Sequence, residues 1–446
     1  MKHSRSPMHR REFLGTTARL GAGLGASAVA GGFASRQATA AARTGTDSGE
    51  RPKATADTCI FVWLAGGMCH LDTFDPKLKG NGEEIAGSYY NPIPTSVPGI
   101  QVCEHLPRVA ERMDRFAIVR SVNHRFNEHT QAVDFVHTGR LASGTIVYPS
   151  IGSIVAHQLG GFDPKAPAYV VVGNPMQPRG PGFLGGKSNF VYLIDTEAGP
   201  AGLRLPGGVS VQEYEDWTRT LKSFSEPYLE KHAETPMVQA YASVMDRGFE
   251  MMSPKFQSAF SVKEEPAELR EAYGKEFGQR LLLSRRLVEN GIRFVECSFN
   301  LHFINGYGWD AHAFAQKRVH LLIRQLDRGL SVLVEDLERR RLLDRTLVVV
   351  ATEFGRPPEF DGQGGRGHQC GGYSVVLFGG GVRGGQAIGA TDELGREIVE
   401  RPVSIPDLHA TIHRALGIDP EEPLMTPGGR PVPITDFGRP VEELFS

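Results

Sequence analysis

The sequence predicts an α/β fold, with a mostly parallel central sheet and helices on both of its faces. Strand-like runs alternate with helix-like segments along the chain, which is the order typical of this class. The strand-like runs are also apolar at nearly every position instead of every second one, which indicates strands buried on both faces. Six runs show this pattern: Cys59–Leu64, Arg115–Arg120, Pro167–Val172, Ile292–Cys297, Thr346–Ala351 and Tyr373–Phe378.

The segments between these runs carry helical periodicity. The pattern from about 226 to 290 ends at Glu289-Asn290-Gly291, a typical helix C-terminus. The clearest helix covers 319–337, where one valine and five leucines recur at three- and four-residue steps with charges between them. A further helix is predicted over 404–416. Helices of this number and length are enough to cover both faces of the sheet.

The N-terminus is typical of a twin-arginine export signal. His9-Arg10-Arg11-Glu12-Phe13-Leu14 precedes a mildly apolar Gly/Ala-rich run over 15–34, and the small residues Ala38-Thr39-Ala40 suit a signal peptidase. The alternative is a basic tail before an ordinary helix, which the glycines would weaken. We therefore expect a signal peptide at 1–42, a polar linker at 43–56 and a single domain at 57–446. The Tat export machinery would deliver the protein to the periplasm or outside the cell.

The charge of the chain excludes one large class of partner. The formal net charge is -2, and removing residues 1–42 takes away six basic and one acidic residue, which leaves 43 basic and 50 acidic residues, a net of -7. No basic stripe remains to attract a phosphate backbone, so we expect no nucleic-acid binding. No stretch after the signal approaches the ~20 apolar residues that span a bilayer, so we expect no membrane span in the mature protein.

Polar clusters follow four of the predicted strands. The side chains in these clusters with the chemistry of metal ligands or anion clamps are Asp72, His129, Asp310, His312, Glu353, Arg356, Arg366 and His368. Carboxylates and neutral imidazoles converging from separate strand ends are typical of a divalent-metal site, and in α/β sheets sites lie at the carboxyl ends of the strands. Each residue also has an ordinary interpretation, for example Asp72 or Asp310 as a helix N-cap.

The motifs resemble, in order, those of a known family of exported bacterial proteins, DUF1501. They include WLAGGMCHLDTFDPK, EHLPR, YPSIGS, GFLG, WDAH, VVVATEFGRPP, GRGH and FGGGVRGGQAIGATDE, and the resemblance covers about residues 55–446. That family resembles in turn the alkaline phosphatase and sulfatase superfamily. The blocks TLVVVATEFG and RPVSIPDLHATIHRALGID are similar to the late strand and the closing helix of sulfatases. The resemblance implies an alkaline phosphatase/sulfatase-like fold.

The resemblance implies site residues, with some departures. The superfamily's first-strand acid matches Asp72, its middle pair matches Asp310 and His312, and its last histidine matches His368. Its late acid pair matches Glu353 and Phe354, so the second ligand of that pair is absent. Counting back from Thr138-Gly139 places the nucleophile position on His129, and the sulfatase Cys-x-Pro-x-Arg motif is missing.

Two functions are consistent with these features. The first is an exported, metal-dependent hydrolase of a phosphate or sulfate ester on an anionic small molecule or polymer, in which zinc, manganese or calcium activates water. Asp72, Asp310, His312, Glu353 and His368 would hold the metal. His129 would be a ligand, a general base or a phosphohistidine nucleophile, and Arg356 and Arg366 would stabilise transition-state charge. The second is a non-catalytic metal-binding or scaffold protein of the cell envelope on a degenerate hydrolase fold.

Overall fold

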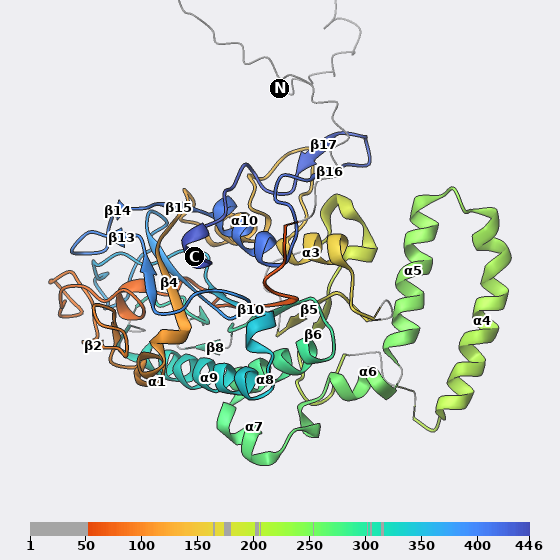
Figure 1. The fold of residues 1–446 in the computed structure, drawn as a ribbon, viewed down its shortest axis with the longest axis horizontal. Helices are drawn as coiled ribbons and strands as arrows, with labels where there is room; N and C mark the ends of the chain where they lie inside the picture. The colour runs from red at the N-terminus through yellow and green to blue at the C-terminus, as the bar shows by residue number, and fades with distance from the viewer. Residues whose placement is uncertain are drawn as a thin grey trace, which may run out of the picture. The chain divides into compact units, whose positions relative to one another are not determined.

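One sheet organises the residues that the computed structural model describes (Figure 1). These are 52–446 without 164–165, 174–179, 201–204, 206, 253, 301, 304–305 and 314–315. The predicted signal peptide at 1–42 and most of the predicted linker therefore lie outside the described residues. Glu50–Ser446 forms one unit by its internal contacts.

The sheet contains nine strands among the described residues. In spatial order they are β12 (Gln386–Ile388), β4 (Phe116–Asn123), β11 (Tyr373–Phe378), β10 (Thr346–Ala351), β1 (Thr58–Trp63), β7 (Phe294–Ser298), β5 (Tyr169–Val172) and β6 (Val191–Leu193), with β15 (Val403–Ser404) pairing with β4. Four two-stranded ribbons lie outside it: β2 (Pro92–Pro94) with β3 (Gln101–Cys103), β8 (His302–Phe303) with β9 (Gly306–Tyr307), β13 (Ala390–Thr391) with β14 (Ile398–Glu400), and β16 (Pro423–Met425) with β17 (Pro431–Pro433).

The helices of the described chain occur between and after these strands. They are α1 (Pro107–Glu111), α2 (His129–Thr138), α3 (Ile151–Leu159), α4 (Val211–Lys231), α5 (Pro236–Met251), α6 (Pro254–Ala259), α7 (Ala267–Tyr273), α8 (Glu276–Glu289), α9 (His320–Arg339) and α10 (Ile405–Ala415). The helical region begins earlier than the pattern predicts, at Val211 and not near 226. A capping box between Ser210 and Glu213 starts α4 there, because it satisfies the first free backbone N–H groups.

The predicted mostly parallel arrangement is confirmed. β1 lies between β10 and β7 and runs parallel to both, with Thr58 opposite Thr346 and Cys59 opposite Phe294. β11 is antiparallel to its neighbours β10 and β4. Each of the six runs predicted as strands forms one of these strands. β4, β10, β1 and β7 consequently end at the same edge of the sheet.

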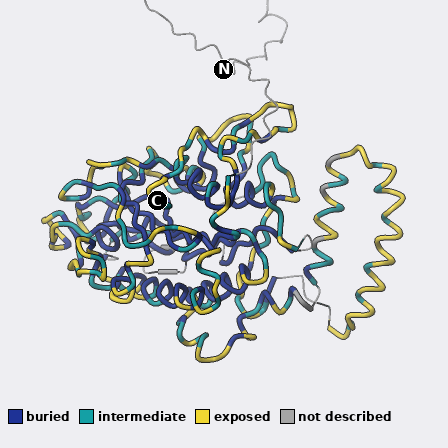
Figure 2. Tube along the Cα trace, in the orientation of Figure 1, coloured by how far each residue is buried: buried dark blue, intermediate teal, exposed yellow. Residues whose placement is uncertain are grey.

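Helices cover both faces of the sheet, as predicted. On β1, Ile60 and Val62 pack into a core shared with α8 and α9, whereas Phe61 and Trp63 pack into a second core shared with α2, α3 and α10. The strands of the sheet are accordingly buried throughout their length near the centre (Figure 2). Within the described residues, no helix is long and apolar enough to span a bilayer.

Two histidines of α10 are buried without charge partners of their own. Burial lowers the pKa of His413 to about 3 and that of His409 to about 4. His409 Nε2 lies 2.8 Å from the carbonyl of Val136, but neither ring nitrogen of His413 has a hydrogen-bond partner in the described chain. Both imidazoles are therefore neutral in the folded protein at neutral pH.

We predict that these histidines make the fold acid-sensitive. Their folded pKa values lie below the unfolded value of about 6.5, so stability is lost as pH falls below 6.5. Between pH 7 and 5, each of the two histidines lowers the free energy of unfolding by about 2 kcal/mol. The free energy of unfolding of His413→Leu, measured with denaturant, should therefore fall by about 2 kcal/mol less than that of the wild type between pH 7 and 5. Equal pH dependence in His413→Leu and the wild type would contradict the prediction, with His232→Ala, at the C-terminal end of α4, as the control.

Candidate metal centre

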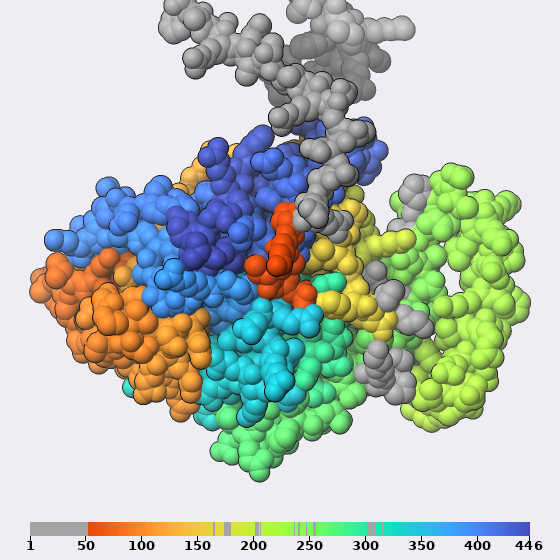
Figure 3. Space-filling model, in the orientation of Figure 1, coloured from red at the N-terminus to blue at the C-terminus, as the bar shows by residue number. Residues whose placement is uncertain are grey.

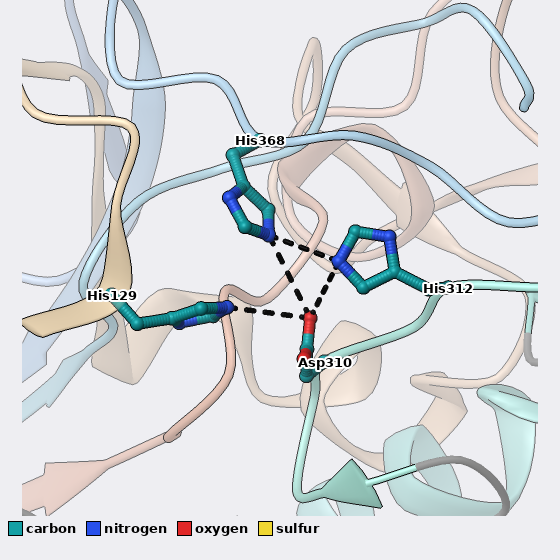
Figure 4. Close-up of side chains that lie close together, drawn as sticks. All are labelled: His129, Asp310, His312 and His368. Carbon is teal, nitrogen blue, oxygen red and sulfur yellow. Dashed lines mark hydrogen bonds and ion pairs between the residues drawn. The ribbon is translucent and has the colours of Figure 1, made fainter. Parts of the chain in front are cut away.

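Four side chains with metal-ligating atoms converge at the carboxyl edge of the sheet. His129 is the first residue of α2, Asp310 and His312 lie in the loop after β9, and His368 lies in the loop between β10 and β11. One ligand atom from each lies within 4.8 Å of all the others (Figure 4). Segments far apart in the sequence thus supply three imidazoles and one carboxylate to one point.

Four separations between ligand atoms of this cluster are near those expected around a tetrahedral ion. His312 Nε2 lies 3.0 Å from both Asp310 Oδ1 and His368 Nε2. Asp310 Oδ1 lies 3.4 Å from His129 Nε2 and 3.7 Å from His368 Nε2. Ligands about 2.0–2.1 Å from a zinc ion lie about 3.3–3.4 Å apart in a tetrahedron, and the observed values bracket that separation.

The outer nitrogens of two of these imidazoles are held in the manner typical of metal ligands. His129 Nδ1 lies 2.9 Å from the Glu353 carboxylate, and His368 Nδ1 lies 2.7 Å from the backbone carbonyl of Asn127. Donation of the Nδ1 proton to these acceptors leaves Nε2 as the ligating nitrogen on each ring. His129 Nε2 is buried and its ion-pair partner is Asp310 Oδ1, 3.4 Å away, a separation at which an ion would fit between them. The residues present therefore fit a divalent metal.

Local sequence explains how these side chains reach one another. Glu128 caps α2 by accepting hydrogen bonds from the backbone N–H groups of Thr130 and Gln131, which starts the helix at His129. Gly66, just past β1, has φ +110°, and a Cβ there would lie 2.3 Å from Asp310 N. Only glycine permits this approach of the Asp310 backbone to β1.

The electrostatics of the cluster favour a proton or a cation at its centre. Burial lowers the pKa of His129, but the hydrogen bonds and charges of Asp310 and Glu353 outweigh burial and raise that pKa to about 9. Burial raises the pKa of Asp310, yet hydrogen bonds from His129 and His368 and the nearby guanidinium of Arg356 hold it well below its usual range. Without an ion, His129 is protonated at neutral pH, so a proton and a metal compete for the same nitrogen.

Arg356 fixes Asp310 and has no donor left for a substrate. Its guanidinium is fully buried and donates to Asp310 Oδ1 at 2.6 Å. Its four other N–H groups donate to the backbone carbonyls of Gly66, Gly67, Arg366 and Gly367. The predicted role of Arg356 in stabilising transition-state charge does not fit this geometry, because every N–H is already bonded within the protein.

Asp72 and Arg366 pair with each other away from the cluster. Both are fully buried, and Arg366 Nε lies 3.0 Å from Asp72 Oδ2. Asp72 also accepts hydrogen bonds from Tyr89 N and the Gln316 side chain, and Arg366 donates to the carbonyls of Gly87, Pro357 and Pro358. The predictions of Asp72 as a metal ligand and Arg366 as an anion clamp are corrected accordingly. Their mutual charge neutralisation holds three loops together.

Glu353 supports the cluster from behind. Its side chain is 2% exposed, and Oε1 accepts hydrogen bonds from His129 Nδ1 and from Gly66 N at 2.7 Å. The prediction of Glu353 as a ligand is therefore corrected to a residue that orients a ligand. Burial raises the pKa of Glu353, but the hydrogen bond and charge of His129 outweigh burial and lower it, so the carboxylate stays ionised.

Solvent reaches the four cluster side chains. They are 30% (His129), 29% (Asp310), 42% (His312) and 20% (His368) exposed. Phe354, at the position where the resemblance implies a second acid, instead stacks on His368 with ring centroids 4.4 Å apart. The sequence gives no sign of this stacking or of the hydrogen bond between His368 and the Asn127 carbonyl. Every residue carries a backbone carbonyl, and only the fold determines which one faces His368.

The fold and site define a mixed α/β protein with a candidate divalent-metal centre at the carboxyl edge of its sheet. The sequence profile of DUF1501, described as a protein of unknown function, matches residues 56–445, and the chain belongs to that family. No curated protein sequence matches it. The family assignment and the α/β class predicted from the sequence are thus confirmed.

Several solved structures resemble parts of this fold. Ps i-CgsB in complex with k-i-k-neocarrahexaose is 13% identical, covering 83% of this chain and 72% of its own, with a TM-score of 0.39. The PsFucS1 sulfatase from Pseudoalteromonas sp. is 12% identical, and the match covers 83% of this chain and 68% of the sulfatase, with a TM-score of 0.38. The phosphonate monoester hydrolase SpPMH from Silicibacter pomeroyi is 12% identical, and the match covers 87% of this chain and 76% of the hydrolase, with a TM-score of 0.38. Similarity at this level says nothing about the activity of this chain.

We predict that Glu353→Gln weakens metal binding by about 10–100-fold, because it removes the charge that holds and polarises His129. Zinc affinity should be measured by competition with a chromophoric chelator. The matched control is Glu359→Gln, a nearby exposed glutamate paired with Arg396, which should leave affinity unchanged. An affinity of Glu353→Gln within twofold of the wild type, with an unchanged melting temperature of the metal-free form, would contradict the assignment.

Proposed function

We propose that this protein is an exported metal-dependent hydrolase of a phosphate or sulfate ester. The observation that carries the proposal is the convergence of His129, Asp310, His312 and His368 with supported ring orientations. The ester class follows from the resemblance of the sequence blocks to sulfatases and alkaline phosphatases. A divalent ion bound there would polarise an ester oxygen and lower the pKa of a water molecule.

The residues of the chain have defined parts in this reaction. His129, His312, His368 and Asp310 would hold the ion, and Glu353 and Arg356 would fix the orientation of His129 and Asp310. The exposure of all four side chains leaves room for water or substrate beside them. Because the position matched to the superfamily nucleophile carries an imidazole and not a hydroxyl, direct attack by water is the consistent route.

A cavity beside the cluster offers space for the organic part of a substrate. It has a volume of about 800 Å³ and runs along α2 from Thr130 to Thr138, and none of the four cluster residues lines it. Thr130 and Gln131, which follow His129 directly, line it together with aromatic side chains such as Phe126, Phe135 and Tyr148.

A non-catalytic metal-binding scaffold is the second candidate. Four protein ligands saturate a tetrahedral ion, as in structural zinc sites. The burial of Arg356 and Arg366 also removes the two cations best suited to a substrate anion. These two observations favour metal binding without turnover.

We predict that the purified protein contains about one divalent ion per chain, measurable by elemental analysis. We also predict that it hydrolyses members of an aryl phosphate and aryl sulfate panel. His368→Ala and Asp310→Asn should lose the ion and at least about 100-fold of the turnover, since the transition-state stabilisation supplied by the ion is worth several kcal/mol. His320→Ala, an imidazole on α9, is the control. Metal without turnover would support the scaffold, and absence of both, with no thermal stabilisation by zinc or manganese, would reject both functions.

Export through the Tat route is part of the proposal and rests on the N-terminal sequence alone. Arg10→Lys together with Arg11→Lys should leave the precursor inside the cell, as judged by fractionation and immunoblotting, because the twin arginines are the recognised feature. Arg19→Lys, in the same segment but outside the pair, should be exported normally. Normal export of the double variant would rule out this route.

A further inference from the structure

Helix α4 packs on α5 through one stripe of its surface (Figure 1). The Tyr214 hydroxyl lies 2.9 Å from the Met252 sulfur, Gln239 Nε2 donates to the Leu229 carbonyl, and Lys222 pairs with Asp246 at 2.9 Å. These contacts define the inner stripe of the helical hairpin. The half-buried side chains of α4 are Tyr214, Thr218, Ser225 and Leu229, and no residue of α4 is fully buried.

A second, apolar stripe on α4 faces solvent. It consists of Trp217, Leu221, Phe224 and Tyr228, which are 58%, 47%, 79% and 56% exposed. In Figure 2 the helix is drawn without a buried segment, and in Figure 3 its outer surface is open to solvent. Single exposed apolar residues are ordinary, but four large ones in a row on one helix indicate an interaction surface.

The spacing of this stripe selects its partner. The steps are four, three and four residues, which is the spacing at which two packed helices meet, over a short stretch that includes Pro227. The order of these steps is the same read from either end. An antiparallel pairing of two copies of α4 about a two-fold axis therefore places Trp217 against Tyr228 and Leu221 against Phe224 of the other copy.

The charges beside the stripe agree with antiparallel pairing. Glu213 and Lys231 lie on the same flank of the stripe, one near each end, at the same angle around the helix. Because equal flanks meet in an antiparallel pair, Glu213 of each copy comes near Lys231 of the other. Opposite charges at both ends favour this orientation, because a parallel pair places each of these charges beside the uncharged flank of the other copy, on which Tyr214 and Thr218 lie.

A membrane surface suits this helix less well. α4 carries five acidic and three basic residues, a net of -2, whereas helices that lie on anionic lipid are rich in lysine and arginine. The helical hairpin contacts the rest of the described chain through α5, where a Cβ built at Gly186 would lie 3.1 Å from Val244 Cγ2. A second copy of this chain is the occupant that fits both the spacing and the charge.

We propose that the protein self-associates through α4, with the stripe Trp217, Leu221, Phe224 and Tyr228 at the two-fold axis. The four side chains offer roughly 500 Å² of apolar surface per copy, given that each large aromatic residue buries about 150–250 Å². The pair buries about 1,000 Å² in all, at the lower end of specific interfaces. Interfaces of this size are typical of weak or transient association.

Sedimentation velocity of the purified protein over about 1–100 µM tests the proposal. The wild type should pass from monomer to dimer, and Leu221→Glu and Phe224→Glu should each raise the dissociation constant at least tenfold. Ser223→Glu, which places the same charge between them on the opposite face, should leave it unchanged. Far-UV circular dichroism checks that each variant keeps its helices.

Cysteine cross-linking tests the register. In an equimolar mixture of the Leu221→Cys and Phe224→Cys single variants, antiparallel pairing should give mainly the mixed disulfide between positions 221 and 224, whereas a parallel pair would give disulfides between two copies of the same variant. A monomer throughout the concentration range, or a dimer insensitive to both glutamate variants, would overturn the proposal. So would a monomer that floats with phosphatidylglycerol vesicles in a Phe224-dependent way.

Discussion

The carboxylate of Glu353 holds the candidate site together. It lies just past β10 and accepts hydrogen bonds from Gly66, just past β1, and from His129 at the start of α2. One buried charge thereby fixes the ends of two neighbouring strands and the entry of a helix from a third. A buried carboxylate needs such partners, because its desolvation is otherwise prohibitive. The orientation of the cluster histidine follows from this requirement of the scaffold.

Two buried arginines extend the same logic to the surrounding loops. Arg356 ties the loop after β10 to Asp310 and to the glycines after β1, while Arg366 ties it to Asp72. Each guanidinium satisfies its donors within the protein, and each neutralises one acid. The loops that carry Asp310, His312 and His368 are therefore positioned by charge pairs that are themselves inaccessible. Such support is what a metal centre on loops needs in order to be preorganised.

The chemistry of the site separates the two functions considered. An ion bound by all four side chains is saturated if tetrahedral, yet their exposure leaves access for a further ligand. Turnover therefore depends on coordination number more than on which residues surround the ion. The apolar stripe of α4 is a separate feature of the chain, distinct in sequence and chemistry from this cluster. A function at either place can be tested without assuming the other.

The sequence alone determined the class of fold, and it predicted all four cluster residues as site residues: Asp310, His312 and His368 as ligands, and His129 as a ligand, base or nucleophile. Continuous apolar runs such as Thr346–Ala351 can only be buried, and parallel strands end at one edge, so the location of a site followed. Only the tertiary structure decided that Asp72 and Arg366 satisfy each other, that Glu353 orients His129, and that the Asn127 carbonyl holds His368. The type of a residue shows what it can bind, but its partner is chosen by segments far away in the chain that the fold brings within hydrogen-bonding distance.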